Sequence, residues 1–153
     1  MQTLYPNHDQ IEAVRHRTGA FLQQNGNAVN PSLFQFTNLL MAIPGVAMEI
    51  LPAPDNIFRI YCTEEANQHI MNIHLDMIAR FKAMFGGNYD WYLPGACNLV
   101  CAYFLYPGKQ GPVWFPVWEA RVSAMDDPRT STAVTRVWGD AITEYLRYNG
   151  FIR

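Results

Sequence analysis

The sequence lacks the long apolar segments that mark membrane proteins. Its longest uninterrupted apolar run, Leu99 to Tyr106, is far shorter than the roughly 18 residues of a membrane-spanning helix. The first residues, Met1 to His8, have neither the basic start nor the apolar centre of a signal peptide. We therefore expect no membrane association.

Charge of either sign is also sparse. The formal net charge is −2, and no run of like charges occurs. This argues against a nucleic-acid-binding protein that relies on a dense basic patch, and against an acidic mimic of DNA. Of the 11 basic residues, only Lys82 and Lys109 are lysines. Arginine predominates at protein interfaces, where lysine is depleted, and it forms flat, bidentate contacts.

Cysteine is scarce, and the common catalytic motifs are missing. The 3 cysteines, Cys62, Cys97 and Cys101, predict reduced, buried thiols in a cytoplasmic protein. A second cysteine pair that could complete a zinc or iron–sulfur site is absent. The sequence has no Gly-rich phosphate loop, no Gly-x-Ser-x-Gly elbow and no His-Glu-x-x-His. We predict no cofactor and no metal, and the missing motifs favour a non-enzymatic role.

Composition and length predict one domain over residues 1–153 without long disorder, because 50% of the residues are hydrophobic and 16% are charged. The helix and strand patterns along the chain predict that this domain is α+β. Apolar periodicity predicts helices over residues 8–24, 30–43, 63–85 and 127–149. Strands are expected over residues 46–51, 57–62, 96–106 and 113–122. This order gives two N-terminal helices and then a ββα-ββα arrangement, with a mostly antiparallel sheet packed by helices. The run 96–106 fits a buried strand or a buried helix, and its aromatic residues favour the strand.

Local signals refine this outline at several positions. Asn7 and Gln10 are spaced as a capping box for the first helix, and Gly26 suits a left-handed position after its last turn. Thr63 is expected to cap the helix over 63–85. Pro116 predicts that the strand over 113–122 lies at an edge of the sheet or contains a bulge.

A polar stripe runs along the predicted helix 63–85. It comprises Glu65, His69, Asn72, Asp76 and Arg80, spaced by three or four residues. One interpretation is a solvated helix face with local ion pairs, including one between Asp76 and Arg80. The alternative is a small hydrolase or transferase that uses a histidine and a carboxylate, with candidate catalytic residues Glu65, His69, His74 and Asp76.

Aromatic residues are abundant, at 14% of the chain. A second set of candidate residues combines them with one arginine: Tyr89, Trp91 and Tyr92 in a predicted loop, and Trp114, Trp118 and Arg121 in the strand 113–122. This composition is typical of energetically dominant interface residues. The alternatives are an aromatic-rich core and an RNA-binding sheet. We expect the partner to be another protein or a second copy of the chain, as in a viral assembly factor or an inhibitor of a host protein.

Overall fold

The protein is an α+β protein, as expected from its sequence. The computed structural model describes residues 5–26, 31–51, 57–86, 98–104, 113–121 and 131–153, and in its last two strands the backbone alone. Its elements are α1 (His8–Asn25), α2 (Pro31–Leu40), β1 (Val46–Leu51), β2 (Ile57–Cys62), α3 (Glu64–Phe85), β3 (Asn98–Phe104), β4 (Val113–Arg121) and α6 (Ser131–Tyr148). Within the run 96–106, which fitted either a strand or a helix, the described residues Asn98–Phe104 are thus a strand. The predicted start of the last helix, at 127, lies outside the described residues.

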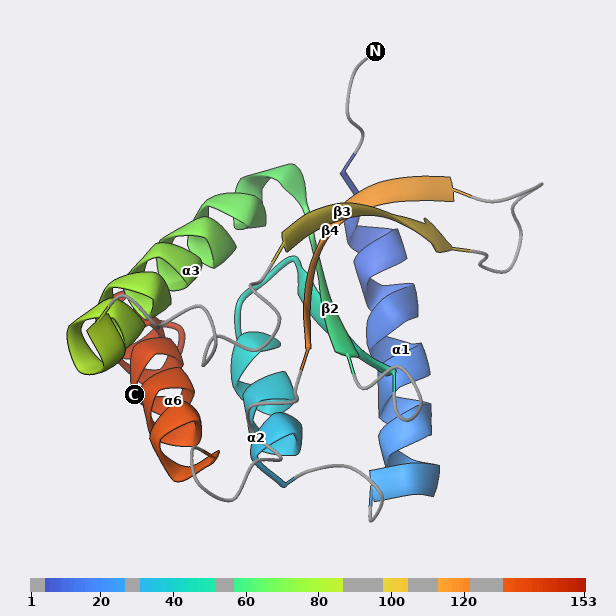
Figure 1. The fold of residues 1–153 in the computed structure, drawn as a ribbon. Coiled ribbons are helices and arrows are strands. Elements are labelled where there is room, and N and C mark those ends of the chain that lie inside the picture. Colours follow the sequence, from blue (N-terminus) through green and yellow to red (C-terminus); the bar gives the residue numbers. More distant parts are fainter. Residues whose placement is uncertain (1–4, 27–30, 52–56, 87–97, 105–112, 122–130) are drawn as a thin grey trace.

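Four strands form one antiparallel sheet in the order β1-β2-β4-β3 (Figure 1). β4 therefore lies between β2 and β3, and the prediction that it is an edge strand was wrong. The prediction of a bulge was also wrong, because the pairing of β3 with β4 runs without a gap from Asn98 and Glu119 to Phe104 and Val113.

The pairing explains how an interior strand tolerates Pro116. β4 pairs with β2 only from Arg121, opposite Ile57, to Trp118, opposite Ile60. Pro116 lies beyond the end of this ladder, so on its β2 side it faces no paired strand. Proline lacks an N–H group and is accepted where no ladder bond is required. The strand is thus interior in the sheet order but has one unpaired side at its proline.

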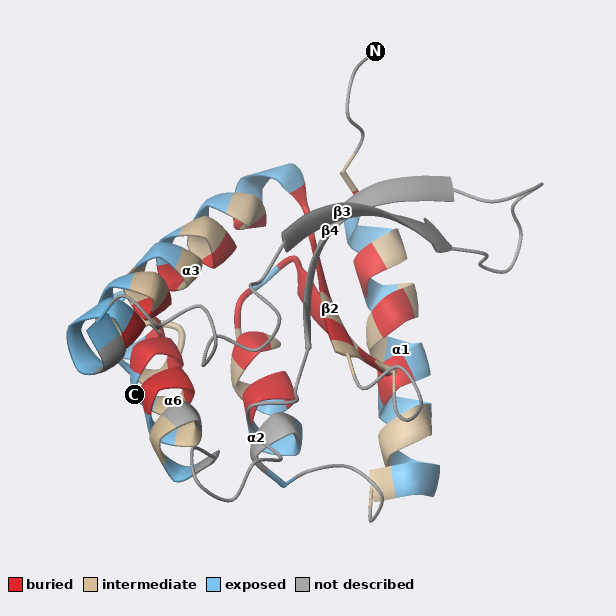
Figure 2. Ribbon diagram, in the orientation of Figure 1, coloured by how far each residue is buried: buried red, intermediate tan, exposed pale blue. Residues whose placement is uncertain are grey.

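Helices cover the two faces of the sheet unequally. α2, α3 and α6 lie on one face, and α1 lies on the other (Figure 1). Figure 2 shows that the buried residues of these helices face the sheet. The main core lies between the sheet and the three helices, and its largest fully buried side chains include Trp138, Phe36, Phe58, Phe81 and Ile142.

The expected helix caps are largely present. Asn7 Oδ1 accepts from the Gln10 N–H at 2.9 Å and Gln10 Oε1 accepts from the Asn7 N–H at 2.9 Å, which confirms the capping box. Thr63 Oγ1 accepts from the Ala66 N–H at 3.2 Å and caps α3. The prediction for Gly26 was wrong: its φ of −56° is right-handed, so the end of α1 does not use the freedom of glycine.

Gly45 occupies the tight turn before β1. Its φ is +82°, and an added Cβ would lie 2.7 Å from Oγ1 of Thr63, the residue that caps α3. We expect Gly45→Ala to lower the free energy of unfolding by about 2 kcal/mol, because it combines backbone strain with displacement of the cap. Urea denaturation followed by circular dichroism measures this loss.

Gly150 supplies the matched control. Its φ is +76°, but no atom of the described residues lies within 4 Å of an added Cβ, its chain neighbours aside. Gly150→Ala should therefore cost about 1 kcal/mol, from strain alone. Equal losses for both variants would mean that the contact with Thr63 contributes nothing.

Candidate functional site

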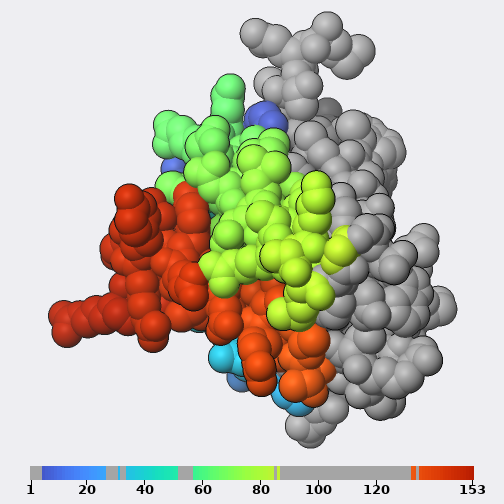
Figure 3. All heavy atoms as spheres, turned by 60° about the vertical axis from the view of Figure 1, so that its left-hand side comes forward, coloured from blue at the N-terminus to red at the C-terminus, as the bar shows by residue number. Residues whose placement is uncertain are grey.

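The polar stripe of α3 lies against α6, where the two helices run side by side (Figures 1 and 3). His69 Nδ1 is 2.6 Å from the hydroxyl oxygen of Tyr145, and Asn72 Nδ2 donates to the same oxygen at 3.4 Å. The Phe151 ring meets the His69 ring edge-on, at 5.0 Å between centroids. One imidazole thus joins α3, α6 and the C-terminal segment.

Arg80 makes the second link in this interface. Its Nε donates to Asp76 Oδ2 at 3.0 Å, which confirms the ion pair expected within the helix. Its Nη2 donates to Glu144 Oε2 on α6. Exposed pairs of this kind contribute little to stability, so they position the helices more than they stabilise them.

The candidate catalytic residues have different surroundings in the structure. His69 contacts Tyr145 on another helix, while Glu65 is exposed in the first turn of α3. Asp76 is engaged by Arg80. His74 lies on a different face of α3 from His69. The two residues are five positions apart, which corresponds to about 1.4 helical turns, so their side chains leave the helix in different directions. The geometry favours a structural role for the stripe over a hydrolase or transferase site.

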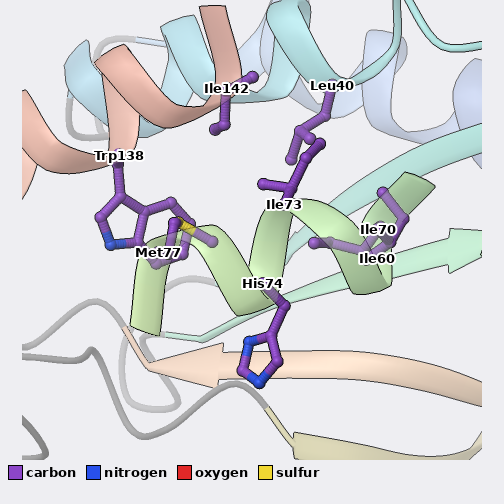
Figure 4. A pocket seen from close by; sticks show the side chains of 8 residues that line it. All are labelled: Leu40, Ile60, Ile70, Ile73, His74, Met77, Trp138 and Ile142. Atoms are coloured by element: carbon purple, nitrogen blue, oxygen red, sulfur yellow. The ribbon is translucent and has the colours of Figure 1, made fainter. Parts of the chain in front are cut away.

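His74 lines a small apolar cavity between the sheet and the helices (Figure 4). The cavity volume is about 10 Å³, which is close to the minimum that holds one water molecule. It is lined by Leu40, Ile60, Ile70, Ile73, His74, Met77, Trp138 and Ile142. A space this small and apolar suits packing rather than catalysis.

Burial of His74 should make folding depend on pH. Desolvation disfavours the imidazolium and lowers the pKa of His74 below its ordinary value of 6.5. The unfolded chain then binds the proton more readily, so stability present above pH 6.5 is lost as the pH falls toward the lower pKa of the folded state. We expect His74→Gln to reduce the loss of stability between about pH 7.5 and about pH 5.

The measurement is urea denaturation of both proteins at the two pH values. His16→Gln, an exposed change on α1, is the control and should retain the wild-type pH dependence. An unchanged pH dependence in His74→Gln would contradict the assignment.

Cys62 has the character of a structural thiol. It is 1% exposed, and burial raises its pKa to about 12. Its Sγ lies 3.7 Å from Asn67 Oδ1. A thiol that stays protonated and inaccessible is a poor nucleophile. In the described part of the chain, no three His, Cys, Asp or Glu side chains are arranged to hold a metal ion.

The β1 edge of the sheet is covered by side chains from α1. Arg15 Nε donates to the Val46 carbonyl at 2.8 Å, and Thr18 Oγ1 donates to the Met48 carbonyl at 2.8 Å. Arg15 Nη2 also donates to the carbonyls of Met41 and Ile43, at 2.9 and 3.0 Å. The bonds to Val46 and Met48 occupy two carbonyls of β1 that an added strand would require.

The opposite edge of the sheet is β3. Among the described elements, only β4 pairs with it. Cys101 lies opposite Pro116, which has no N–H group, so we assign this as a non-hydrogen-bonded pair. Strand alternation then directs the N–H and C=O groups of Leu99, Cys101 and Tyr103 away from β4.

The same alternation can be checked at the other edge. The alternation of hydrogen-bonded and non-hydrogen-bonded pairs continues from β4 through β2 to β1. At β1 it directs the carbonyls of Val46 and Met48 away from β2. These are the two β1 carbonyls that accept from α1 side chains, which supports the assignment. Neither the sheet order nor the role of α1 was found from sequence, because both depend on contacts between distant segments.

The predicted partner-binding residues divide into two groups. Tyr89, Trp91 and Tyr92 lie outside the described residues. Trp114, Trp118 and Arg121 belong to β4, where the backbone pairs them with Tyr103, Ile60 and Ile57, respectively. Trp118 also pairs with Leu99, so β4 connects the core of the protein to β3, the last strand of the described sheet.

Comparison with known protein families, curated proteins and solved structures finds no match to this chain. None of the helices in the described ranges is long and apolar enough to cross a membrane. The function must therefore be argued from the site itself.

Proposed function

We propose that this protein acts by binding another protein, or a second copy of itself, through the outer edge of β3. The observation that carries the proposal is the difference between the two sheet edges. Carbonyls at the β1 edge accept hydrogen bonds from Arg15 and Thr18. Within the described residues, no strand or helix end pairs with the β3 edge.

The composition of β3 supports strand addition. Asn98–Phe104 has the sequence NLVCAYF, without a charged residue, proline or glycine. Natural edge strands usually carry lysine, proline or a bulge that prevents pairing with other chains. Unpaired N–H and C=O groups on such a strand offer main-chain hydrogen bonds to an incoming strand. An assembly factor or an inhibitor could use this edge.

The predicted ββα-ββα arrangement fits the same proposal. β2 and β4 are antiparallel neighbours at the centre of the sheet, each hairpin precedes a helix, and α3 packs on α6. We infer two ββα units related by an approximate two-fold axis between β2 and β4. The outer strand of the first unit is covered by α1, and a binding partner would cover the outer strand of the second.

The aromatic and arginine surface predicted from sequence stays a prediction within this proposal. Trp114, Trp118 and Arg121 lie on the strand next to β3. Their positions would allow them to add contacts beside an incoming strand, and the backbone hydrogen bonds do not depend on them.

The test introduces a proline at Cys101. The proline prevents an added strand from pairing with β3 and leaves the hydrogen bonds between β3 and β4 intact. Cys101→Pro removes an outward N–H group, whereas Cys101→Ala retains it. We expect the wild type and the alanine variant, immobilised on beads, to retain a common protein from a lysate of the source cells. The proline variant should lose it. Retention of the same proteins by all three would contradict the proposal, provided that their unfolding curves agree.

A further inference from the structure

We propose that a second copy of the chain occupies the β3 edge, with the two β3 strands antiparallel about a two-fold axis at Cys101. This inference rests on the proposed function and names its partner. The arrangement joins two four-stranded sheets into one continuous sheet. Closed two-fold pairs are the commonest form of soluble oligomer.

The register follows from the backbone. The outward N–H and C=O groups belong to Leu99, Cys101 and Tyr103 by the alternation that Pro116 sets. A two-fold axis at Cys101 places Cys101 opposite its own copy and Leu99 opposite Tyr103. All three outward residues then exchange hydrogen bonds with the second strand. An axis centred elsewhere on β3 leaves at least one of them without a partner on the other β3.

The absence of charge on β3 makes the identical strand an acceptable partner. Across a two-fold axis, residues near the axis face copies of themselves, so any charge there would be repelled by its own copy. Asn98–Phe104 carries none. The backbone groups, by contrast, are self-complementary, because each outward residue supplies one donor and one acceptor.

The other edge is partly occupied by the protein's own side chains. Carbonyls of Val46 and Met48 already accept from α1 side chains. Glu49 of the same strand is paired with Arg17 and accepts from the Tyr61 hydroxyl at 3.1 Å. Two-fold pairing through one edge of each chain gives closed dimers rather than fibres.

Light scattering during size-exclusion chromatography tests the dimer. We expect wild type and Cys101→Ala to have twice the chain mass of 17.5 kDa at high concentration. Cys101→Pro should have the mass of one chain while keeping its unfolding midpoint, because the lost N–H group is not bonded to β4. A wild type that remains monomeric at every concentration up to about 1 mM would overturn the dimer. A dissociation constant of about 1 mM corresponds to an association free energy of about −4.1 kcal/mol.

Charge substitutions at the axis test the register and do not depend on a proline. Cys101→Lys and Cys101→Glu each place like charges opposite one another, so each variant alone should be monomeric. An equimolar mixture should form a heterodimer. Two variants that each dimerise as strongly as wild type would exclude an axis at Cys101.

The results also separate this inference from the broader proposal. A monomeric wild type that still binds another protein, with that binding abolished in Cys101→Pro, overturns only the second copy as partner. A monomeric wild type whose captured proteins are the same as those of Cys101→Pro overturns both.

Discussion

Replacing Trp138 by alanine is expected to lower the free energy of unfolding by about 3–5 kcal/mol. The side chain is 2% exposed and connects three elements. Its ring stacks on Phe36 of α2 at 5.5 Å and meets Phe58 of β2 edge-on at 5.1 Å. Truncation removes these contacts and leaves a cavity that the surrounding helices cannot fill. For a domain with about 5–15 kcal/mol of stability, the loss is large.

Trp138→Phe separates ring packing from the indole N–H group. Trp138 Nε1 is buried and has no hydrogen-bond partner among the residues that the structure describes, and such a donor costs about 1–3 kcal/mol. Phenylalanine keeps an aromatic ring and removes this donor, so we expect a loss below about 2 kcal/mol. Urea denaturation of both variants decides the matter. Losses of similar size would mean that the indole N–H group is bonded in solution.

Arg15→Met should cost about 2–4 kcal/mol, because one guanidinium serves three backbone carbonyls. Those of Met41 and Ile43 belong to the segment between α2 and β1, and that of Val46 begins the strand. Methionine retains the apolar stem and leaves the three oxygens without these donors. Arg15→Lys should recover only part of the loss, since an ammonium cannot reproduce the planar fork.

Glu12→Gln is the matched control for this experiment. Glu12 lies 3.8 Å from the same guanidinium, on the exposed side of α1. Removing its charge leaves the three carbonyl bonds intact and should change the free energy of unfolding by less than about 0.5 kcal/mol. Chemical denaturation of both variants gives their free energies of unfolding. If Arg15→Met loses no more than Glu12→Gln, the bonds from Arg15 to the three carbonyls do not stabilise the fold.

Sequence predicted the elements whose causes are local. The bounds of β1 and β2 follow from alternation between turn residues, and α3 begins after Thr63, as its capping hydroxyl requires. The capping box at Asn7 depends on residues only three positions apart. Such features need no knowledge of the rest of the fold.

The site was less accessible to prediction because its determinants are distant in sequence. The contact of His69 with Tyr145 spans 76 positions, and neither interpretation of the stripe, as a solvated face or as a catalytic site, included a partner on α6. Pro116 indicated an edge strand, but β4 lies inside the sheet. Pro116 instead lies beyond the point where the pairing of β4 with β2 ends. Arg15 and Thr18 gave no sign that they cover a strand, because they lie 31 and 30 positions from their partners.

Amide hydrogen exchange in β3 tests the central claim most directly. In dilute protein, the amides of Leu99, Cys101 and Tyr103 should exchange fast, and those of Val100 and Ala102 slowly. At concentrations that form the complex, all five should be slow, because the outward groups become hydrogen-bonded to the second strand. Slow exchange at the outward positions in the monomer would contradict an open edge. Fast exchange there at every concentration would contradict a second copy of the chain as the partner.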